Sequence, residues 1–344
     1  MSAITSTAAL DTCVYDTLAS IGEKVLEIEI LPDALGPFSK DEGEGEGAGD
    51  GEYISIGITK KALVRAFTTA RRVFFDSLNH GSGQLAETEQ AAASASAIIL
   101  VFDSEHLTAC NWRKRRITSR LEGSDAARSS SRRPGTKEDT YTDLLSVECN
   151  LTASLLRSPL HRHAKSPTLW YHRFWVMAQH ARESQSSEIE MLNYEVDLVL
   201  RAAVHHPMNY YAFSYLRQYL ALLACIVAGG ARDRSEPITY EVVAELSRGT
   251  AEVTSRLISD TNLITTMCDW CLRNPGDNSG WMFLFHLLSL LDDGAVQHDV
   301  VQRVIQFGFR VRWQKEALWT FVELAVLKFK IVSDLACAVV GDEQ

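Results

Sequence analysis

Cys268 and Cys271 lie one helical turn apart and are the first residues whose types suggest chemistry. A CxxC pair occurs in zinc sites and in redox dithiols. A structural zinc site needs four ligands, yet no second CxxC follows, and His286 and His298 stand at an unsuitable spacing. A redox dithiol needs a strand–helix–strand context, which the surrounding pattern lacks. We therefore interpret the pair as core thiols and predict no metal site in this chain.

Five histidines in the middle of the chain are the next residues that could act as ligands or as acid–base groups. Tuning the pKa of a histidine requires a specific charged partner, and the sequence identifies none. Two of the five stand beside a proline in a predicted turn, where solvated histidines are common. We expect packing or capping roles for these residues, which are His161, His163, His172, His205 and His206.

The charge of the chain excludes nucleic acid as its default partner. Its 344 residues carry a net charge of −10, whereas phosphate backbones are bound by basic surfaces. Positive charge is concentrated between Arg113 and Lys137, where nine Lys or Arg residues face two acids. This stretch is either a contact for diphosphate, an acidic partner or an anionic membrane, or a solvated helix end followed by a loop. No glycine-rich phosphate loop, nucleophile elbow or HExxH pair is present.

The apolar pattern and the cysteines predict a cytoplasmic protein. No run approaches the 18 apolar residues that a membrane span needs, and the N-terminus lacks the pattern of a secretory signal. The seven cysteines are odd in number and lie mostly within helical apolar patterns, as expected for reduced thiols.

Helices must position these residues, because apolar side chains recur at steps of three and four along most of the chain. Short alternating runs at 25–30 and 53–58 have no hairpin partner with turn residues, so we predict an all-α fold. The expected helices are 59–78, 85–103, 106–120, 140–157, 166–182, 187–204, 208–228, 238–257, 261–273, 278–292, 297–310 and 315–339.

Composition divides the chain into two parts. Residues 1–58 form an N-terminal segment whose acidic, glycine-rich linker, 41–52, we expect to be disordered. Residues 59–340 form a helical repeat domain, interrupted by a basic loop insertion at about 121–139.

A short pattern recurs at the starts of four predicted helices, each preceded by an amphipathic helix. The copies read LTACNWRKR, KSPTLWYHRFW, MNYYAFSYLRQ and DNSGWMFLFHLL, with anchors at Cys110, Trp170, Phe213 and Trp281. In each, a polar residue caps the helix and a large side chain one turn later fills the groove to its neighbour. Such pairs cannot bury their apolar faces alone, so we expect a right-handed superhelix of antiparallel helix pairs, a TPR-like solenoid.

This pattern resembles the alpha-subunit repeat of protein prenyltransferases. KSPTLWYHRFWV is the best match, and the fourth copy is most similar to prenyltransferase alpha subunit repeat-containing proteins. The copies cover about residues 100–292. The resemblance implies structural roles for the motif residues Cys110, Arg113, Trp170, His172, Arg173, Asn209, Phe213, Asn278 and Trp281.

Several positions depart from the family pattern. The expected tryptophan is Cys110 in the first copy and Phe213 in the third, and the arginine three places later is leucine in the third and fourth copies. The lysine that helps farnesyl-type subunits bind prenyl diphosphate is Met208 here. Tyr210 survives two places later, and Lys165 has the equivalent offset in the second copy. These two residues are the catalytic candidates.

The resemblance implies an alpha-type subunit of a heterodimeric protein prenyltransferase, of the geranylgeranyl type. Such a subunit scaffolds a catalytic beta subunit and a cysteine-tailed protein substrate. The beta subunit carries the zinc ion, which lowers the pKa of the acceptor thiol, so no cofactor is expected in this chain. The alternative is a non-enzymatic helical-repeat scaffold for protein–protein interaction. Met208 and the degenerate motifs favour the alternative, whereas the second and third copies favour the geranylgeranyl type.

Overall fold

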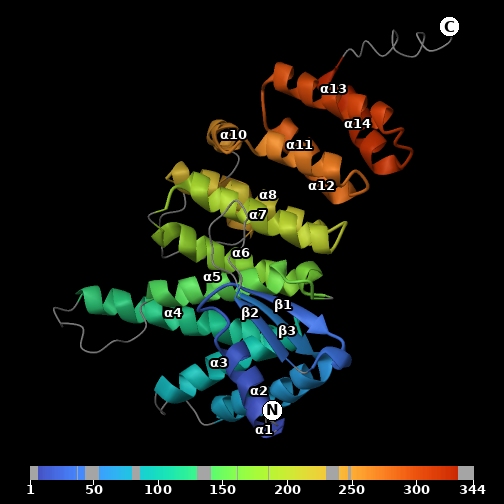
Figure 1. The fold of residues 1–344 in the computed structure, drawn as a ribbon. Helices are drawn as coiled ribbons and strands as arrows, with labels where there is room; N and C mark the ends of the chain where they lie inside the picture. Colours follow the sequence, from blue (N-terminus) through green and yellow to red (C-terminus); the bar gives the residue numbers. More distant parts are fainter. Residues whose placement is uncertain are drawn as a thin grey trace. The chain divides into compact units, whose positions relative to one another are not determined.

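The computed structural model describes residues 7–36, 38–42, 54–79, 86–129, 141–160, 162–184, 186–229, 240–246 and 249–331 (Figure 1). The chain divides into two compact units. The first unit is Met1–Gln185 with Val196–His206, and the second is Ser186–Glu195 with Pro207–Gln344.

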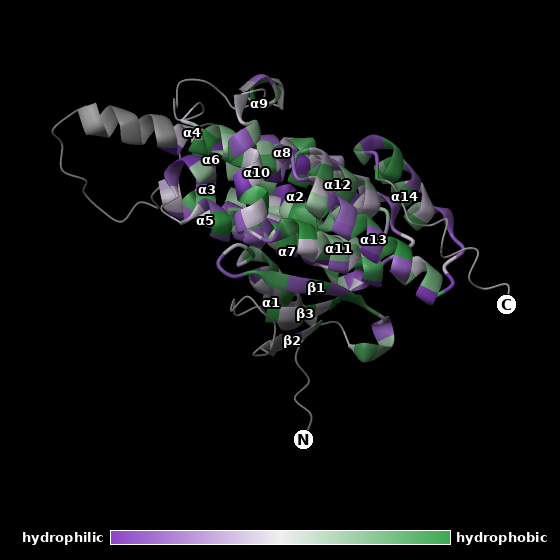
Figure 2. Cartoon of the chain, turned by 90° about the horizontal axis from the view of Figure 1, so that it is seen from above, coloured by the Kyte–Doolittle hydropathy of each residue, from purple (hydrophilic) through white to green (hydrophobic). Residues whose placement is uncertain are grey.

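The described residues are mostly helical, which confirms the predicted all-α class; the superhelix itself stays a prediction. Most helices carry hydrophilic and hydrophobic residues together, as expected for helices that bury one face (Figure 2). Within the described residues no helix is long and apolar enough to cross a bilayer. The helices of the first unit are α1 (Thr7–Ala19), α2 (Lys60–Asn79), α3 (Ala86–Phe102), α4 (Leu107–Ser129), α5 (Tyr141–Arg157) and α6 (Pro167–Glu183).

Helix α7 (Glu188–His205) contributes residues to both units. The described part of the second unit continues with further helices. These are α8 (Tyr210–Val227), α9 (Tyr240–Leu246), α10 (Ala251–Asp260), α11 (Leu263–Arg273), α12 (Asn278–Ser289), α13 (Gly294–Arg310) and α14 (Glu316–Phe329).

Helices pack against their neighbours in sequence and against the helix after next. In the first unit α5 contacts α6, while α3 contacts α5 and α4 contacts α6. In the second unit α11 contacts α12 and α13 contacts α14, while α12 also contacts α8 and α14. This alternation is the packing expected of stacked helix pairs, in which each pair buries its apolar face against the next.

A three-stranded sheet precedes α2, although the sequence analysis predicted no sheet. Strands β1 (Leu26–Leu31) and β3 (Ile54–Thr59) pair in parallel, and β2 (Phe38–Glu42) pairs antiparallel with β3. The two alternating runs are therefore each other's partners. The prediction failed because it looked for hairpin turns, whereas parallel strands are joined by a longer crossover.

The sheet packs on the helices through Ser154 of α5 and Ser158, the residue that follows this helix. The backbone N–H of Leu26 donates to Ser154 Oγ and that of Ile28 donates to Ser158 Oγ, both at 2.8 Å. Leu26 and Ile28 are buried, so these strand donors face the interior and need such partners. The N-terminal strands are thereby part of the first unit.

Three further expectations need correction or lie outside the described residues. The predicted helix 238–257 is two helices, α9 and α10, interrupted at Gly249, and α1 was not predicted. The acidic linker falls outside the described residues except for Asp41 and Glu42, which pair with β3. Helix α4 runs to Ser129, which is well into the predicted basic loop, and residues 130–140 are outside the described chain.

Candidate functional site

The four repeat anchors occupy the same place in their helices. Cys110, Trp170, Phe213 and Trp281 are each the fourth residue of a helix: α4, α6, α8 and α12. All four side chains are buried. In each copy the anchor's backbone N–H donates to the carbonyl of the residue four before it, at 3.2–3.4 Å. The four copies are therefore locally equivalent.

The capping residues are equally regular, because each stands four places before its anchor. Ser166 Oγ accepts from Leu169 N at 3.1 Å, and Asn209 Oδ1 accepts from Ala212 N at 3.2 Å. Asp277 accepts from two backbone N–H groups of α12, at 2.9 and 3.1 Å. His106 Nδ1 accepts from Ala109 N at 3.2 Å in the first copy. Each cap satisfies a donor that the first turn leaves open.

The tryptophan anchors are held by a second bond. The indole N–H of Trp170 donates to the Ala164 carbonyl at 2.7 Å, and that of Trp281 donates to the Pro275 carbonyl at 3.0 Å. In both copies the acceptor is six residues earlier. The indole thus ties the helix start to the turn before it.

A further copy of the signature, which the sequence analysis missed, lies in α14. Trp319 is the fourth residue of this helix, and its indole donates to the carbonyl of Trp313, again six residues earlier, at 2.8 Å. The signal in the sequence is the spacing Trp281-x-Phe283, which recurs as Trp319-x-Phe321. The rings of Trp281 and Phe321 pack with centroids 5.0 Å apart.

The motif arginines of the first two copies make the same contacts with the preceding helix. Arg113 Nη1 donates to the Ala93 carbonyl and to Ser96 Oγ, both at 2.8 Å. Arg173 Nη1 donates to the Cys149 carbonyl at 3.1 Å and to Thr152 Oγ1 at 2.9 Å. In both cases the acceptors are a carbonyl and the hydroxyl three residues later. The arginine therefore clamps the second helix of a pair to the first.

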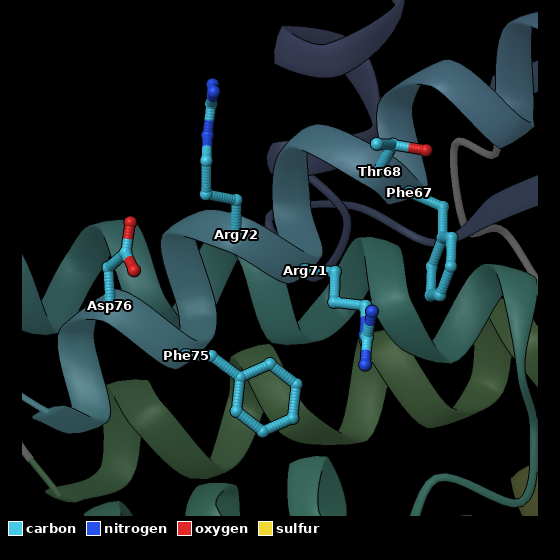
Figure 3. A pocket seen from close by; sticks show the side chains of 6 residues that line it. All are labelled: Phe67, Thr68, Arg71, Arg72, Phe75 and Asp76. Atoms are coloured by element: carbon cyan, nitrogen blue, oxygen red, sulfur yellow. The ribbon is translucent and has the colours of Figure 1, made fainter.

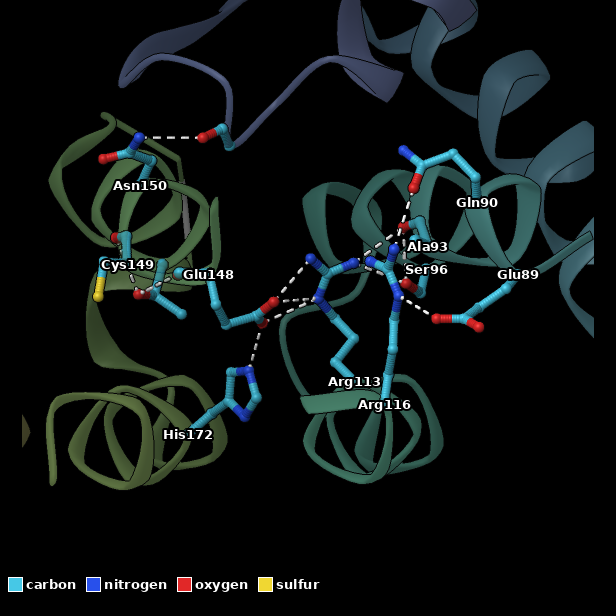
Figure 4. A network of polar contacts seen from close by, with 12 residues as sticks. Glu89, Gln90, Ala93, Ser96, Arg113, Arg116, Glu148, Cys149, Asn150 and His172 are labelled. Atoms are coloured by element: carbon cyan, nitrogen blue, oxygen red, sulfur yellow. Dashed lines mark hydrogen bonds and ion pairs between the residues drawn. The ribbon is translucent and has the colours of Figure 1, made fainter. Parts of the chain in front are cut away.

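Glu148, in the middle of α5, joins two copies of the motif (Figure 4). Its carboxylate accepts two bonds from Arg113 Nε, at 2.8 and 2.9 Å, pairs with Arg113 Nη2 at 2.7 Å, and contacts His172 Nε2 at 2.7 Å. All three side chains are buried. The Arg113 charge and the His172 hydrogen bond hold the pKa of Glu148 well below its usual range, although burial opposes this. Burial lowers the pKa of His172, which favours a neutral ring.

The second unit contains a related pair. The hydroxyl of Tyr215, two places after the third anchor, donates to Glu195 Oε2 at 2.5 Å, and both residues are buried. His172 is likewise two places after its anchor. Sequence reasoning overlooked both acids. The burial of Glu148 could have been predicted from its position in the helical pattern. It follows Leu144 by four residues and precedes Leu151 by three, which places it on the buried face of its helix.

The third and fourth copies replace the arginine by leucine. Leu216 and Leu284 are fully buried, so an apolar contact stands where the first two copies have a clamp. In the fourth copy the helices also approach closely, because a Cβ on Gly280 would lie 2.4 Å from the ring of Trp270. Asn278, which was predicted to be structural, is exposed at the start of α12.

The catalytic candidates are exposed. Lys165 ends a short 3-10 turn, His163–Lys165, in the first unit, and Tyr210 opens α8 in the second unit. Met208, which stands at the lysine position of the motif, is also exposed and has a left-handed backbone with φ of 58°. Its N–H donates to Asp277 Oδ2 at 2.7 Å.

The CxxC pair is buried, and of the remaining histidines His205 is exposed at the end of α7. His163 is buried, in keeping with the packing role expected of it rather than with a solvated turn, and its Nε2 contacts the Leu100 carbonyl at 2.9 Å. His206 Nε2 contacts the Leu160 carbonyl at 2.8 Å, and His161 lies outside the described residues. Burial raises the pKa of the Cys268 thiol to about 11 and that of Cys271 well above its usual value. Among the described residues no group of three His, Cys, Asp or Glu side chains could hold a metal ion.

Comparison with known proteins identifies the repeat. Residues 192–223 match the family model of the protein prenyltransferase alpha subunit repeat, which supports the predicted family. The matched segment comprises most of α7 and α8 and therefore includes the third copy with its anchor Phe213. A search of curated proteins gave no significant match.

Proposed function

We propose that this chain, which carries a protein prenyltransferase alpha subunit repeat, is the alpha-type subunit of a heterodimeric protein prenyltransferase of the geranylgeranyl type. In this role it scaffolds a beta subunit and a cysteine-tailed protein substrate. The beta subunit supplies the zinc ion that makes the acceptor sulfur a thiolate. The present chain supplies surface and positioning.

The observation that carries the proposal is the division of the matched repeat into a buried and an exposed set. The side chains of Phe213, Tyr215 and Leu216 are buried and pack α8 against its neighbours. The side chains around the start of this helix are exposed instead: Met208 is 62% exposed and Tyr210 is 66% exposed. Large apolar and aromatic side chains that remain exposed to solvent in the folded protein are typical of protein–protein contact surfaces.

Co-purification with a beta subunit tests the scaffolding role. We expect a one-to-one complex that the double change Tyr210→Glu and Tyr211→Glu weakens about tenfold or more, because two charges enter a contact that buries aromatic rings. Val311→Glu, at an exposed apolar position just after α13, is the control and should leave the affinity unchanged. A complex that is indifferent to the tyrosine change would contradict the placement of the contact.

A transfer assay tests the enzymatic role. The chain is mixed with a beta subunit, labelled geranylgeranyl diphosphate and a cysteine-tailed acceptor protein. Incorporation of label that depends on this chain supports the proposal. If Lys165 contacts the diphosphate, Lys165→Ala should raise the KM for the prenyl donor about tenfold, since a charged hydrogen bond is lost.

The second candidate function is a helical scaffold that binds partners without catalysis. Met208 favours it, because a thioether replaces the cationic group that would face a diphosphate. The two functions separate cleanly in the assays above. A stable complex that transfers no prenyl group under any acceptor condition would favour the scaffold.

A further inference from the structure

The side of α2 next to its core-facing side carries a stripe of large side chains, here called the outward stripe. It consists of Val64, Phe67, Arg71, Phe75 and Leu78, spaced at steps of three and four, so all five lie on one side of the helix. The core contacts Leu63, Ala66, Ala70 and Phe74 lie on the adjacent side, about a quarter turn around the helix. Val64 and Leu78 are each 40% exposed. Among the described residues, the neighbours of this helix therefore cover the outward stripe only in part: Val64, Arg71 and Leu78 are exposed, and the two phenylalanines are half-buried.

The middle of the stripe holds a shallow, open groove. It has a volume of about 360 Å³, and the described residues that line it all belong to α2, among them Phe67, Arg71 and Phe75. Figure 3 shows Arg71 between the two phenylalanines, on the same side of the helix. Its guanidinium carbon lies 5.6 Å from the centre of the Phe75 ring.

Neighbouring elements fix the two rings. Phe67 stacks on Phe102 at the end of α3, with ring centres 4.1 Å apart. Phe75 packs edge-on against His106, just before α4, with ring centres 6.4 Å apart. Because the rings are supported from behind, they present preformed walls on either side of Arg71. A ligand would therefore order few side chains on binding.

The charge on this helix is strongly positive. It carries Lys60, Lys61, Arg65, Arg71 and Arg72 against one acid, Asp76, in a chain whose net charge is −10. Among the described residues no carboxylate forms an ion pair with Arg71 or Arg72, and both side chains are exposed. Lys61, Arg65 and Arg72 follow one edge of the outward stripe, since they are spaced four and seven residues apart. The stripe thus combines an apolar seam with a cationic edge.

We propose that the outward stripe of α2 is a docking surface for an acidic amphipathic helix of a partner protein. Apolar residues of the partner, spaced three and four apart, would pack against Val64, Phe67, Phe75 and Leu78. Glutamates or aspartates flanking that seam would pair with Arg71 and Arg72. This is the helix-on-helix mode of recognition, in which spacing gives the fit and opposite charge gives the specificity. The inference does not depend on the proposed prenyltransferase role.

An anionic membrane is a less suitable occupant of the same surface. A helix that lies on a bilayer inserts a broad apolar face with its basic residues at the margins. Here Arg71 lies in the centre of the apolar stripe, between two half-buried rings, and Asp76 stands among the lining residues. A carboxylate can reach Arg71 in this groove, whereas acyl chains would have to cover its charge.

The test uses the full-length chain and a designed peptide of three heptads, with leucine at the seam positions and glutamate at the flanking positions. We expect a Kd of about 10–100 µM by fluorescence anisotropy, weakening steeply with added salt. Arg71→Glu together with Arg72→Glu should weaken binding about tenfold or more, because attraction becomes repulsion. Val64→Asp should also weaken it, through the apolar seam.

Matched controls make the outcome decisive. Arg256→Glu reverses a charge that is also exposed, on α10, and should leave the affinity unchanged. The same peptide with lysine in place of glutamate should not bind the wild-type chain, and should gain affinity for the reversed variant. Circular dichroism confirms that each variant is folded. Failure of the acidic peptide to bind, or binding that is insensitive to Arg71 and Arg72, overturns the proposal. So does tighter binding to phosphatidylserine vesicles that is lost in the reversed variant.

Discussion

At the scale of single residues, Glu148 has the largest consequences. It is fully buried and its carboxylate is satisfied by Arg113 and His172, which come from two different copies of the repeat. A buried ion pair is strongly destabilising when one partner is removed, because the other charge is left without compensation. Glu148 is therefore a structural group, and no catalytic role needs to be assigned to it.

Replacing Glu148 by Gln should lower the free energy of unfolding by about 3 kcal/mol or more, because Arg113 stays charged and buried. Urea denaturation followed by circular dichroism measures the change. Glu89→Gln is the matched control, since Glu89 pairs with Arg116 and Arg120 at the partly exposed edge of the same network. It should cost less than about 1 kcal/mol. Equal costs for the two variants would show that burial does not set the energy of the Glu148 pair.

His286 makes a prediction about pH. Burial, reinforced by the charge of Arg217, lowers its pKa to about 4. Below about pH 6.5 the His286 ring is protonated in the unfolded chain but stays neutral in the folded chain. The free energy of unfolding is therefore highest above that pH and decreases as the pH falls toward 4. Between about pH 7.5 and pH 5 we expect the wild type to lose about 1–2 kcal/mol more than His286→Gln, allowing for partial exposure. His298→Gln, at an exposed position on α13, should follow the wild type; a parallel loss in all three proteins would rule the assignment out.

At the scale of elements, much of the fold could be predicted, because helix periodicity and caps are local signals. Prediction and structure agree closely at α2, α5, α6 and α7. The parallel pairing of β1 with β3 could not be predicted, since it depends on contacts between residues far apart in sequence. The candidate site divides in the same way. The anchors are visible as a pattern, whereas the link between Arg113 and Glu148 spans 35 residues and emerges only when helices pack.

The caps allow a stabilising change to be predicted. Lys315 stands at the N-cap of α14 with an extended backbone, but makes no side-chain capping bond. Lys315→Asp should raise the free energy of unfolding by about 0.5–1 kcal/mol, because its carboxylate can accept from the first turn. Asp293→Ala provides the opposite control, since Asp293 Oδ1 accepts from Ala295 N and Val296 N and its loss should cost about 1 kcal/mol. Thermal unfolding measures the stability of the two variants relative to the wild type. A loss of stability in Lys315→Asp would contradict the capping geometry.

At the scale of the whole molecule, the N-terminal strands and the helical repeats are not independent in the first unit. Ser158, which directly follows α5, is buried and accepts from the Ile28 backbone 130 residues earlier in the chain. This hydrogen bond brings two segments that are distant in sequence into contact and joins the sheet to the repeat helices. The boundary that composition placed near residue 58 is thus crossed by buried hydrogen bonds.

Removing this bond should destabilise the first unit as a whole. Ser158→Ala leaves the N–H of Ile28 buried without an acceptor and should cost about 1–3 kcal/mol. Hydrogen exchange should then be faster in β1 and β3 together. Ser146→Ala, at an exposed position of α5, should change neither quantity. Faster hydrogen exchange confined to α5 would contradict the prediction, because it would show that the sheet is stable without this bond to the repeats.

The cysteines described above offer a native record of how each unit opens. Cys110 is buried in the first unit and Cys225, Cys268 and Cys271 are buried in the second, and burial raises the pKa of all four thiols. Alkylating reagents attack the thiolate, so these groups react only when their surroundings come apart. The labelling rate at each cysteine, read by mass spectrometry, therefore reports the local opening equilibrium without any introduced probe. Each of the two units therefore contains native cysteines whose labelling measures how often that unit opens.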